Sequence, residues 1–248
     1  NSIASGGNYN TVVGDEAGTA ITTGDNNTAV GYASLSANTT GVNMTAVGYN
    51  AGLSHTTGNS STFIGTDSGK LTTTGVGNTF VGDGSGRQNT TGASNVAIGQ
   101  SALLANTTAS NNTAVGLNAL TANTTGGDNV AIGKDALDAN TTGSGNTAVG
   151  SSAGTGITTG INNTIVGGLA GDVLSDADYN VAIGHQALTS DTKGGSAVAV
   201  GYAALFSQNF TSSTDNYNTA VGYNAGGAVT SGTNNTLIGG LAGDAITT

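Results

Sequence analysis

The feature that most constrains this chain is an internal repeat of 17 residues. Each repeat contains a short stretch such as "TAVG", whose final glycine we take as an anchor and call position 0. Twelve of the thirteen intervals between successive anchors are 17 residues long, and the interval from Gly201 to Gly222 is 21. A disordered chain has no reason to keep such a count, whereas a structure that returns to the same place in every repeat does. The fourteen anchors are Gly14, Gly31, Gly48, Gly65, Gly82, Gly99, Gly116, Gly133, Gly150, Gly167, Gly184, Gly201, Gly222 and Gly239.

The residue types within a repeat favour a short strand followed by turns. Position −1 is always Val or Ile, position −3 is always Thr or Val, and position −4 is usually Asn. β-Branched residues predict a strand that ends at the anchor, and the anchor glycine and the glycine of "TTG" predict two turns. The sequence therefore predicts an all-β fold, a parallel β-solenoid or β-roll of about fourteen 17-residue coils with equivalent residues stacked in columns. We expect one solenoid over residues 1–248, with a four-residue insertion within 205–217 and no separate capping domain.

Two positions of the repeat exchange volume with each other. Every repeat with a large residue at position −2 has Gly at position +4, and every repeat with Leu at +4 has Ala at −2. A fixed interior volume explains this rule, because two large side chains would overpack it. The large residues at position −2 are Val12, Phe63, Phe80, Ile165 and Leu237. Three repeats have Ala with Gly, and their space is expected to be filled by Leu53, Ile157 and Val229.

The opposite face of the predicted strand is apolar as well. Positions −1 and −3 point away from position −2, because side chains alternate along a strand. A strand that is apolar on both faces is usually buried on both. Since one thin coil has only one interior, we expect the second face to meet copies of the same chain in a homo-oligomer. Which face is the core and which is the interface stays open at this point.

Composition excludes several classes of function. Four Lys and Arg against fourteen Asp and Glu give a net charge of −10, too few cations for binding nucleic acid. No cysteine is present to form a disulfide or a thiolate metal site, and no apolar run reaches the ~18 residues needed for membrane insertion. Acidic residues recur at no single position and form no convergent pair. We therefore expect no enzyme activity, no catalytic residue, no cofactor and no metal.

Several motifs resemble functional sites but coincide with the repeat. "GTDSGKL" (65–71) looks like a phosphate loop, yet Leu71 stands where a Mg²⁺-binding Ser or Thr should follow Lys70. "GSSAG" (150–154) matches a nucleophile elbow, yet both of its glycines belong to the repeat. His55 and His185 fall at different repeat positions, and we expect both to be exposed and variable rather than ligands.

Three surface features are left over. Sequons of the form N-x-S/T come with the repeat, which favours turn-forming Asn and Thr ladders over glycosylation; they include Asn38, Asn89, Asn106, Asn123 and Asn140. Tyrosines follow some anchors at a variable position, where they are expected to be exposed, either as plain surface or as contacts to sugars or a receptor; these are Tyr32, Tyr49, Tyr202 and Tyr223. The insertion, with Phe206 and Phe210, is expected to bulge from the shaft.

The stretches "NVAIGQSAL" (95–103), "NVAIGKDAL" (129–137) and "NVAIGHQAL" (180–188) resemble the head repeats of YadA-like trimeric autotransporter adhesins, which also occur in phage tail fibres. The resemblance covers the whole chain. It implies a left-handed parallel β-roll, a homotrimer with three chains side by side, and an extracellular place on a cell or virion surface. The 17-residue period and the "NTTG" segment make the second half of this coil larger than in that family.

Two functions remain in competition. The first is a non-catalytic fibre or adhesin shaft that contacts itself, attaches to a surface receptor or glycan, and belongs to a longer chain or assembles end to end. The second is an ice-binding solenoid that presents Thr ladders. Ice-binding solenoids usually show T-x-T, whereas the threonines of "TTG" are adjacent and would point to opposite faces of an extended strand.

Overall fold

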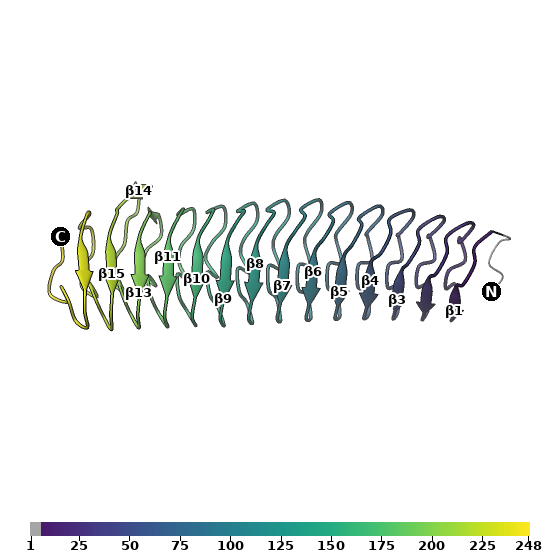
Figure 1. The fold of residues 1–248 in the computed structure, drawn as a ribbon, viewed down its shortest axis with the longest axis horizontal. Coiled ribbons are helices and arrows are strands. Elements are labelled where there is room, and N and C mark those ends of the chain that lie inside the picture. Colours follow the sequence, from purple (N-terminus) through teal and green to yellow (C-terminus); the bar gives the residue numbers. More distant parts are fainter. Residues whose placement is uncertain (1–5) are drawn as a thin grey trace. The chain divides into compact units, whose positions relative to one another are not determined.

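The computed structural model describes residues 6–248, which contain strands and turns and no helix. It has two compact units, Asn1–Thr125 and Gly126–Thr248. The strands of the first unit are β1 (Thr11–Val13), β2 (Thr28–Val30), β3 (Thr45–Val47), β4 (Thr62–Ile64), β5 (Thr79–Val81), β6 (Val96–Ile98) and β7 (Thr113–Val115) (Figure 1). Those of the second unit are β8 (Val130–Ile132), β9 (Thr147–Val149), β10 (Thr164–Val166), β11 (Val181–Ile183), β12 (Gly194–Gly195), β13 (Val198–Val200), β14 (Thr214–Asp215), β15 (Thr219–Val221) and β16 (Thr236–Ile238).

Within each unit, equivalent residues of successive repeats lie side by side. In the first unit β1 to β7 pair in parallel in chain order, with Thr28 opposite Thr45 and Phe63 opposite Phe80. In the second unit the same register joins β8, β9, β10, β11, β13, β15 and β16. The predicted all-β parallel solenoid is confirmed, with one strand for each of the fourteen anchors. The prediction of a single solenoid over 1–248 stays a prediction.

The anchor glycines form a column of their own, and their backbone explains why no other residue occupies it. All have φ between 126° and 141°. A Cβ atom on Gly31 would lie 2.5 Å from the carbonyl oxygen of Gly48 in the next coil, so stacked backbones leave no room for a side chain. Non-glycine residues also take left-handed φ values, including Ala33 at 53° and Leu35 at 47°, which the sequence pattern does not reveal.

The face of the strand at position −2 is the core. Phe63 and Phe80 are fully buried, and their rings stack 5.6 Å apart. A Cβ on Gly86, at position +4, would meet the ring of Phe80 at 2.5 Å, so the two positions face each other inside the coil. The volume rule is therefore confirmed. Positions −1 and −3 point outward and are half-buried or exposed, which answers the question that the sequence left open.

A third inward position, +7, escaped the sequence analysis. Ile157 and Val229 lie there and are fully buried, as expected, but Leu53 is half-exposed. In that coil the interior is filled by His55, which occupies position +7 in the same way as Ile157 and Val229. The prediction for Leu53 was wrong because it lies at position +5, on the other side of the backbone.

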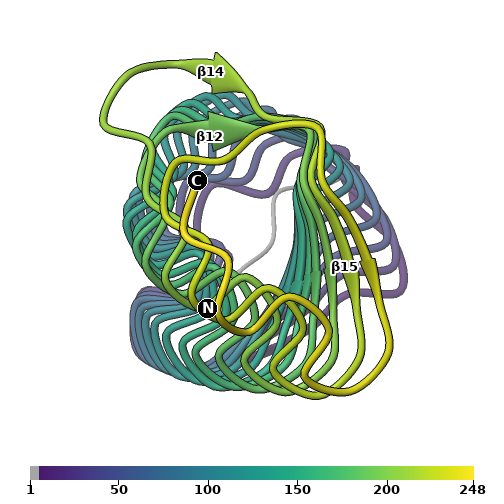
Figure 2. The same cartoon turned by 90° about the vertical axis from the view of Figure 1, so that its left-hand side faces the viewer.

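The insertion leaves the column of strands undisturbed. β13 and β15 pair in register, with Val198 opposite Thr219, although 21 residues separate their anchors. The extra residues pass through β14, which pairs with β12 and stands outside the coil (Figure 2). In the same view the chain of the second unit passes from β14 to β15 clockwise while advancing toward the viewer, so this coil is left-handed, as the resemblance implied.

Candidate functional site

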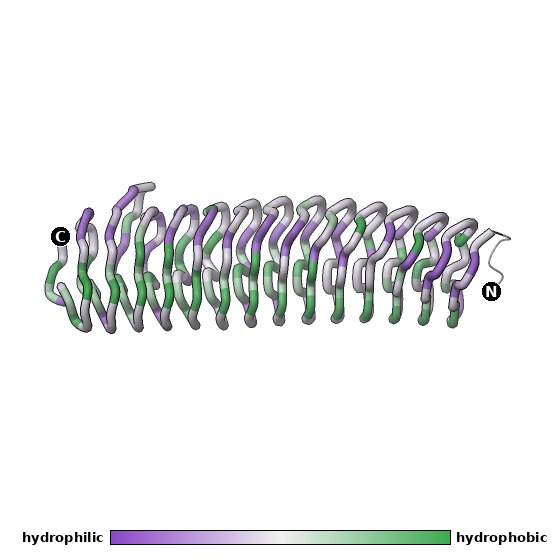
Figure 3. The backbone as a smooth tube through the Cα atoms, in the orientation of Figure 1, coloured by the Kyte–Doolittle hydropathy of each residue, from purple (hydrophilic) through white to green (hydrophobic). Residues whose placement is uncertain are grey.

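The outward strand face, made of positions −3 and −1, is the most extensive regular surface in each unit. It carries one column of Thr or Val and one column of Val or Ile, which give the strands their apolar colour in Figure 3. The isoleucines of this face are 38–41% exposed at four inner rungs, namely Ile64, Ile98, Ile132 and Ile183. Repeating apolar side chains at the spacing of parallel strands form a surface suited to packing against another sheet.

Two columns of buried asparagine hold neighbouring coils together. At position −4, the backbone N–H of Asn95 donates to Oδ1 of Asn78 at 3.0 Å, and its side-chain amide donates to the carbonyl of Ala109 at 2.9 Å. At position +7, the amide of Asn106 donates to Oδ1 of Asn89 at 2.7 Å. The sequon asparagines named above all occupy position +7 and are 0% exposed. A buried amide cannot carry a glycan in the folded chain, so these positions serve the ladder.

The two threonines of "TTG" play different parts. The hydroxyl of the first donates to the carbonyl of the equivalent residue in the next coil, as in Thr39 to Thr56 and Thr56 to Thr73, both at 3.1 Å. The second threonine is exposed, as at Thr40 and Thr57. Each "TTG" segment therefore contributes one outward column of threonine, while the hydroxyl of its neighbour is engaged within the coil.

The tyrosines that follow the anchors are exposed, as predicted, and stack on one another. The rings of Tyr32 and Tyr49 lie 5.4 Å apart at an angle of 14° in the first unit. In the second unit His185 stacks on Tyr202 at 5.8 Å and Tyr202 on Tyr223 at 5.3 Å. The carboxylate of Glu16 is the main cause of a raised pKa at Tyr32, because it disfavours the phenolate.

The phosphate-loop lookalike is an ion-pair cluster. Nζ of Lys70 lies 3.1 Å from the carboxylate of Asp67, and Nε of Arg87 lies 3.5 Å from it. Partial burial favours the neutral form of Asp67, but hydrogen bonds from Asn50 and Lys70 and the two cations outweigh it and lower the pKa of this carboxyl. Lys70 is therefore engaged by its own coil. In "GSSAG", Ser152 has a left-handed φ of 55° in the turn after the anchor.

The two histidines differ from each other. His185 is exposed, as predicted, but the prediction for His55 was wrong, because His55 is 0% exposed and its ring centre lies 5.9 Å from that of Phe63. Neither ring nitrogen of His55 has a hydrogen-bond partner among the described residues. Burial lowers the pKa of His55 to about 4, and the backbone near Gly75 offsets only part of that effect. The missed signal was its position +7, where other repeats carry Ile, Leu or Asn.

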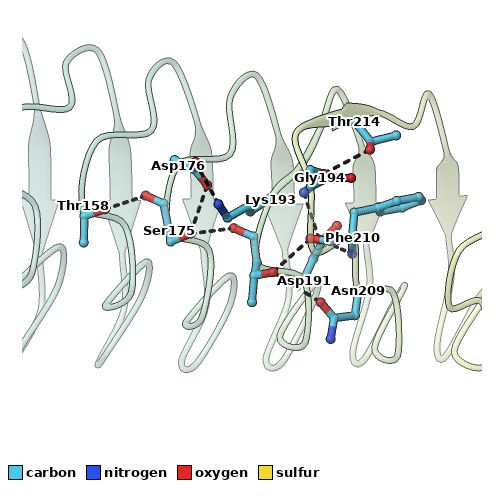
Figure 4. A network of polar contacts seen from close by, with 11 residues as sticks. Thr158, Ser175, Asp176, Asp191, Lys193, Gly194, Asn209, Phe210 and Thr214 are labelled. Carbon is cyan, nitrogen blue, oxygen red and sulfur yellow. Dashed lines mark hydrogen bonds and ion pairs between the residues drawn. The ribbon is translucent and has the colours of Figure 1, made fainter.

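The insertion is anchored by a buried carboxylate at position +7 (Figure 4). Asp191 accepts hydrogen bonds from the backbone N–H of Gly194 at 2.9 Å and of Phe210 at 3.0 Å, and from the amide of Gln208 at 2.7 Å. Phe210 is consequently buried, whereas Phe206 is exposed. The prediction that the segment bulges from the shaft is confirmed, and residues 211–213 are its exposed tip.

Residues 6–248 bring together no group of three His, Asp or Glu side chains that could hold a metal ion, and they enclose no pocket. The described part of the chain also lacks a helix of the length and apolarity that crossing a bilayer requires. Comparisons with protein-family models, with curated proteins and with solved structures found no match.

Proposed function

We propose that this chain is a non-catalytic structural fibre or adhesin shaft, which mediates attachment or spacing at an extracellular cell or virion surface. It assembles as a homotrimer, side by side, and its coils continue end to end into a fibre. The single observation that carries the proposal is the outward strand face, which repeats a Val or Ile beside a Thr or Val on every rung.

The chemistry of this face favours packing over solvation. Single exposed apolar residues are ordinary on protein surfaces, but a column of them on successive strands is a continuous apolar surface. Two such sheets pack face to face at about 10 Å, with side chains interdigitating between them. A second copy of this chain offers a matching surface, because its rungs have the same spacing.

The rest of the surface fits a fibre in contact with water. The net charge of −10 keeps separate assemblies apart, and the carboxylates recur in no column. The resemblance of residues 95–103, 129–137 and 180–188 to adhesin head repeats supports the same function.

Light scattering on the purified chain tests the proposal. A homotrimer predicts a particle of three times 23.7 kDa that persists on dilution, and electron microscopy predicts rods of constant diameter. A stable monomer of 23.7 kDa at high concentration would reject the assembly.

A second function, ice binding, is favoured by the exposed column of second threonines. These hydroxyls recur once per coil at a spacing of about 4.8 Å, as at Thr40 and Thr57. The partner of each, the first threonine of "TTG", is engaged with the next coil, which leaves this side with one threonine column rather than two. A thermal hysteresis assay distinguishes the two functions, since a fibre or adhesin shaft predicts no freezing-point depression beyond the colligative value.

A further inference from the structure

A stack of three aromatic rings stands on the surface of the second unit and ends at glycine on both sides. The aromatic ladder consists of His185, Tyr202 and Tyr223, all at position +1, with neighbouring rings inclined by 5° and 10°. The same position is Gly168 one rung before the ladder and Gly240 one rung after it. Inside the ladder the ring faces cover one another. The outer face of His185 has no side chain of the adjacent rung against it.

The rung at Gly168 has room for a group to continue the stack. A Cβ atom there would lie 3.5 Å from Cδ2 of His185, an ordinary contact distance, and 3.8 Å from the carbonyl oxygen of Ser151. Ser151 occupies position +1 on the far side of Gly168 and is exposed. The space is therefore bounded by an aromatic face on one side and a small residue with a hydroxyl on the other.

Resting on the proposed function, we infer that the Gly168 rung is a subsite for a neutral sugar ring of a surface glycan. One face of a pyranose is rich in C–H groups and packs on the electron-rich face of an aromatic ring. Its hydroxyl rim can exchange hydrogen bonds with the Ser151 hydroxyl, which both donates and accepts.

Other planar ligands fit this rung less well. A free aromatic molecule gains most when both of its faces are buried in a concave pocket, and the described residues form none. An anionic sugar meets a chain of net charge −10, and the nearest cation along this column, Lys134, is paired with Asp135 at 3.2 Å. A neutral sugar needs neither a pocket nor a free cation.

The first unit provides an internal comparison. Its stacked pair, Tyr32 and Tyr49, is bounded at position +1 by Asp15 and Thr66, both of which carry side chains. No glycine rung opens beside that pair. The subsite is accordingly assigned to the ladder of His185 alone.

Histidine NMR tests this inference directly, because the chain has only two histidines and His55 is buried. The full chain, labelled with ¹³C and ¹⁵N at histidine, is titrated with neutral tetrasaccharides of glucose, galactose and N-acetylglucosamine. At least one of them is expected to shift the ring signals of His185 saturably, with a Kd on the order of millimolar for a single shallow subsite, while the signals of His55 stay in place.

Variants separate the subsite from general surface binding. Gly168→Tyr is expected to extend the ladder over the face of His185 and to abolish the response, because Gly168 is not left-handed and its Cβ position is free. Tyr49→Ser, in the first unit, is the matched control and should leave the response unchanged. The inference is overturned if Gly168→Tyr responds like the parent chain, if no tetrasaccharide shifts His185, or if only indole does so. Light scattering of the same samples keeps the outcomes apart: an intact trimer without the response rejects the subsite alone, and a responsive monomer rejects the assembly alone.

Discussion

At the scale of single residues, the interior of each coil is a column whose rungs must sum to one volume. Positions −2 and +4 could be paired from the sequence, because fourteen repeats in one chain show which combinations are absent. Position +7 was missed because it mixes Asn, Ile, Leu and His, which share no chemical type. The left-handed conformations of Ala33 and Leu35 were also missed, since only glycine signals such a backbone in a sequence.

Exchanging two residues of one coil tests the volume rule. Phe80→Ala is expected to cost about 3–5 kcal/mol by opening a cavity. Gly86→Leu alone is expected to destabilise by overpacking against the ring of Phe80. The double variant recreates the arrangement of the next coil, Ala97 with Leu103, where Leu103 has nearly the same φ as Gly86. It should recover most of the lost stability in chemical denaturation, and additive losses would contradict the rule.

His55 makes the stability of the first unit depend on pH. The unfolded histidine titrates near 6.5 and the folded one at about 4, so the fold favours the neutral ring. Its contribution is therefore complete above pH 6.5, declines as the pH falls toward 4 and is absent below that, a loss of about 3 kcal/mol. His55→Ile reproduces the coil of Ala148, Gly154 and Ile157. Denaturation at pH 7 and pH 4 should show a smaller difference for this variant, and an equal difference would mean that His55 is not the titrating group.

At the scale of the coil, hydrogen bonds rather than side-chain volume set the register. Each strand contributes only three residues, and the amide ladders of positions −4 and +7 and the threonine hydroxyls add bonds between coils. The strand, the anchor and these ladders could be predicted because β-branched residues, glycine and asparagine each signal one backbone role. The path of the insertion could not, because its buried Asp191 and Phe210 occur in one repeat only.

Shortening the insertion tests whether the strand column depends on it. Replacing residues 209–217 with the five residues of 124–128, "TTGGD", restores the 17-residue interval. The β13–β15 register should persist, because it already spans the insertion. Asp191 would lose the N–H of Phe210, one of its three donors, so this variant should be less stable.

The added change Asp191→Asn should restore part of that stability, since an uncharged amide suits a buried position with fewer donors. Thermal melts followed by circular dichroism measure both variants. Loss of the β signal in the shortened chain carrying Asp191→Asn would show that the insertion is required for folding.

At the scale of the whole molecule, function follows from what the repeated outward strand face meets. Ile98→Lys places a charge on this face, and in a trimer three such charges would enter the interface. The particle mass from light scattering should fall from three times 23.7 kDa toward 23.7 kDa. Thr74→Lys adds the same charge at an exposed "TTG" position and should leave the trimer intact. Equal behaviour of the two variants would place the interface elsewhere.

The stacking of one coil on the next is tested most directly by distances between spin labels. The chain has no cysteine, so pairs introduced at exposed threonines of the first unit are labelled uniquely. The pairs Thr40 with Thr91, Thr40 with Thr108 and Thr23 with Thr108, diluted with unlabelled chain, are three, four and five repeats apart. At about 4.8 Å per coil, pulsed electron resonance should give distances that rise in equal steps, from about 14 Å through about 19 Å to about 24 Å. Distances that do not increase by one equal step per 17 residues would contradict the account.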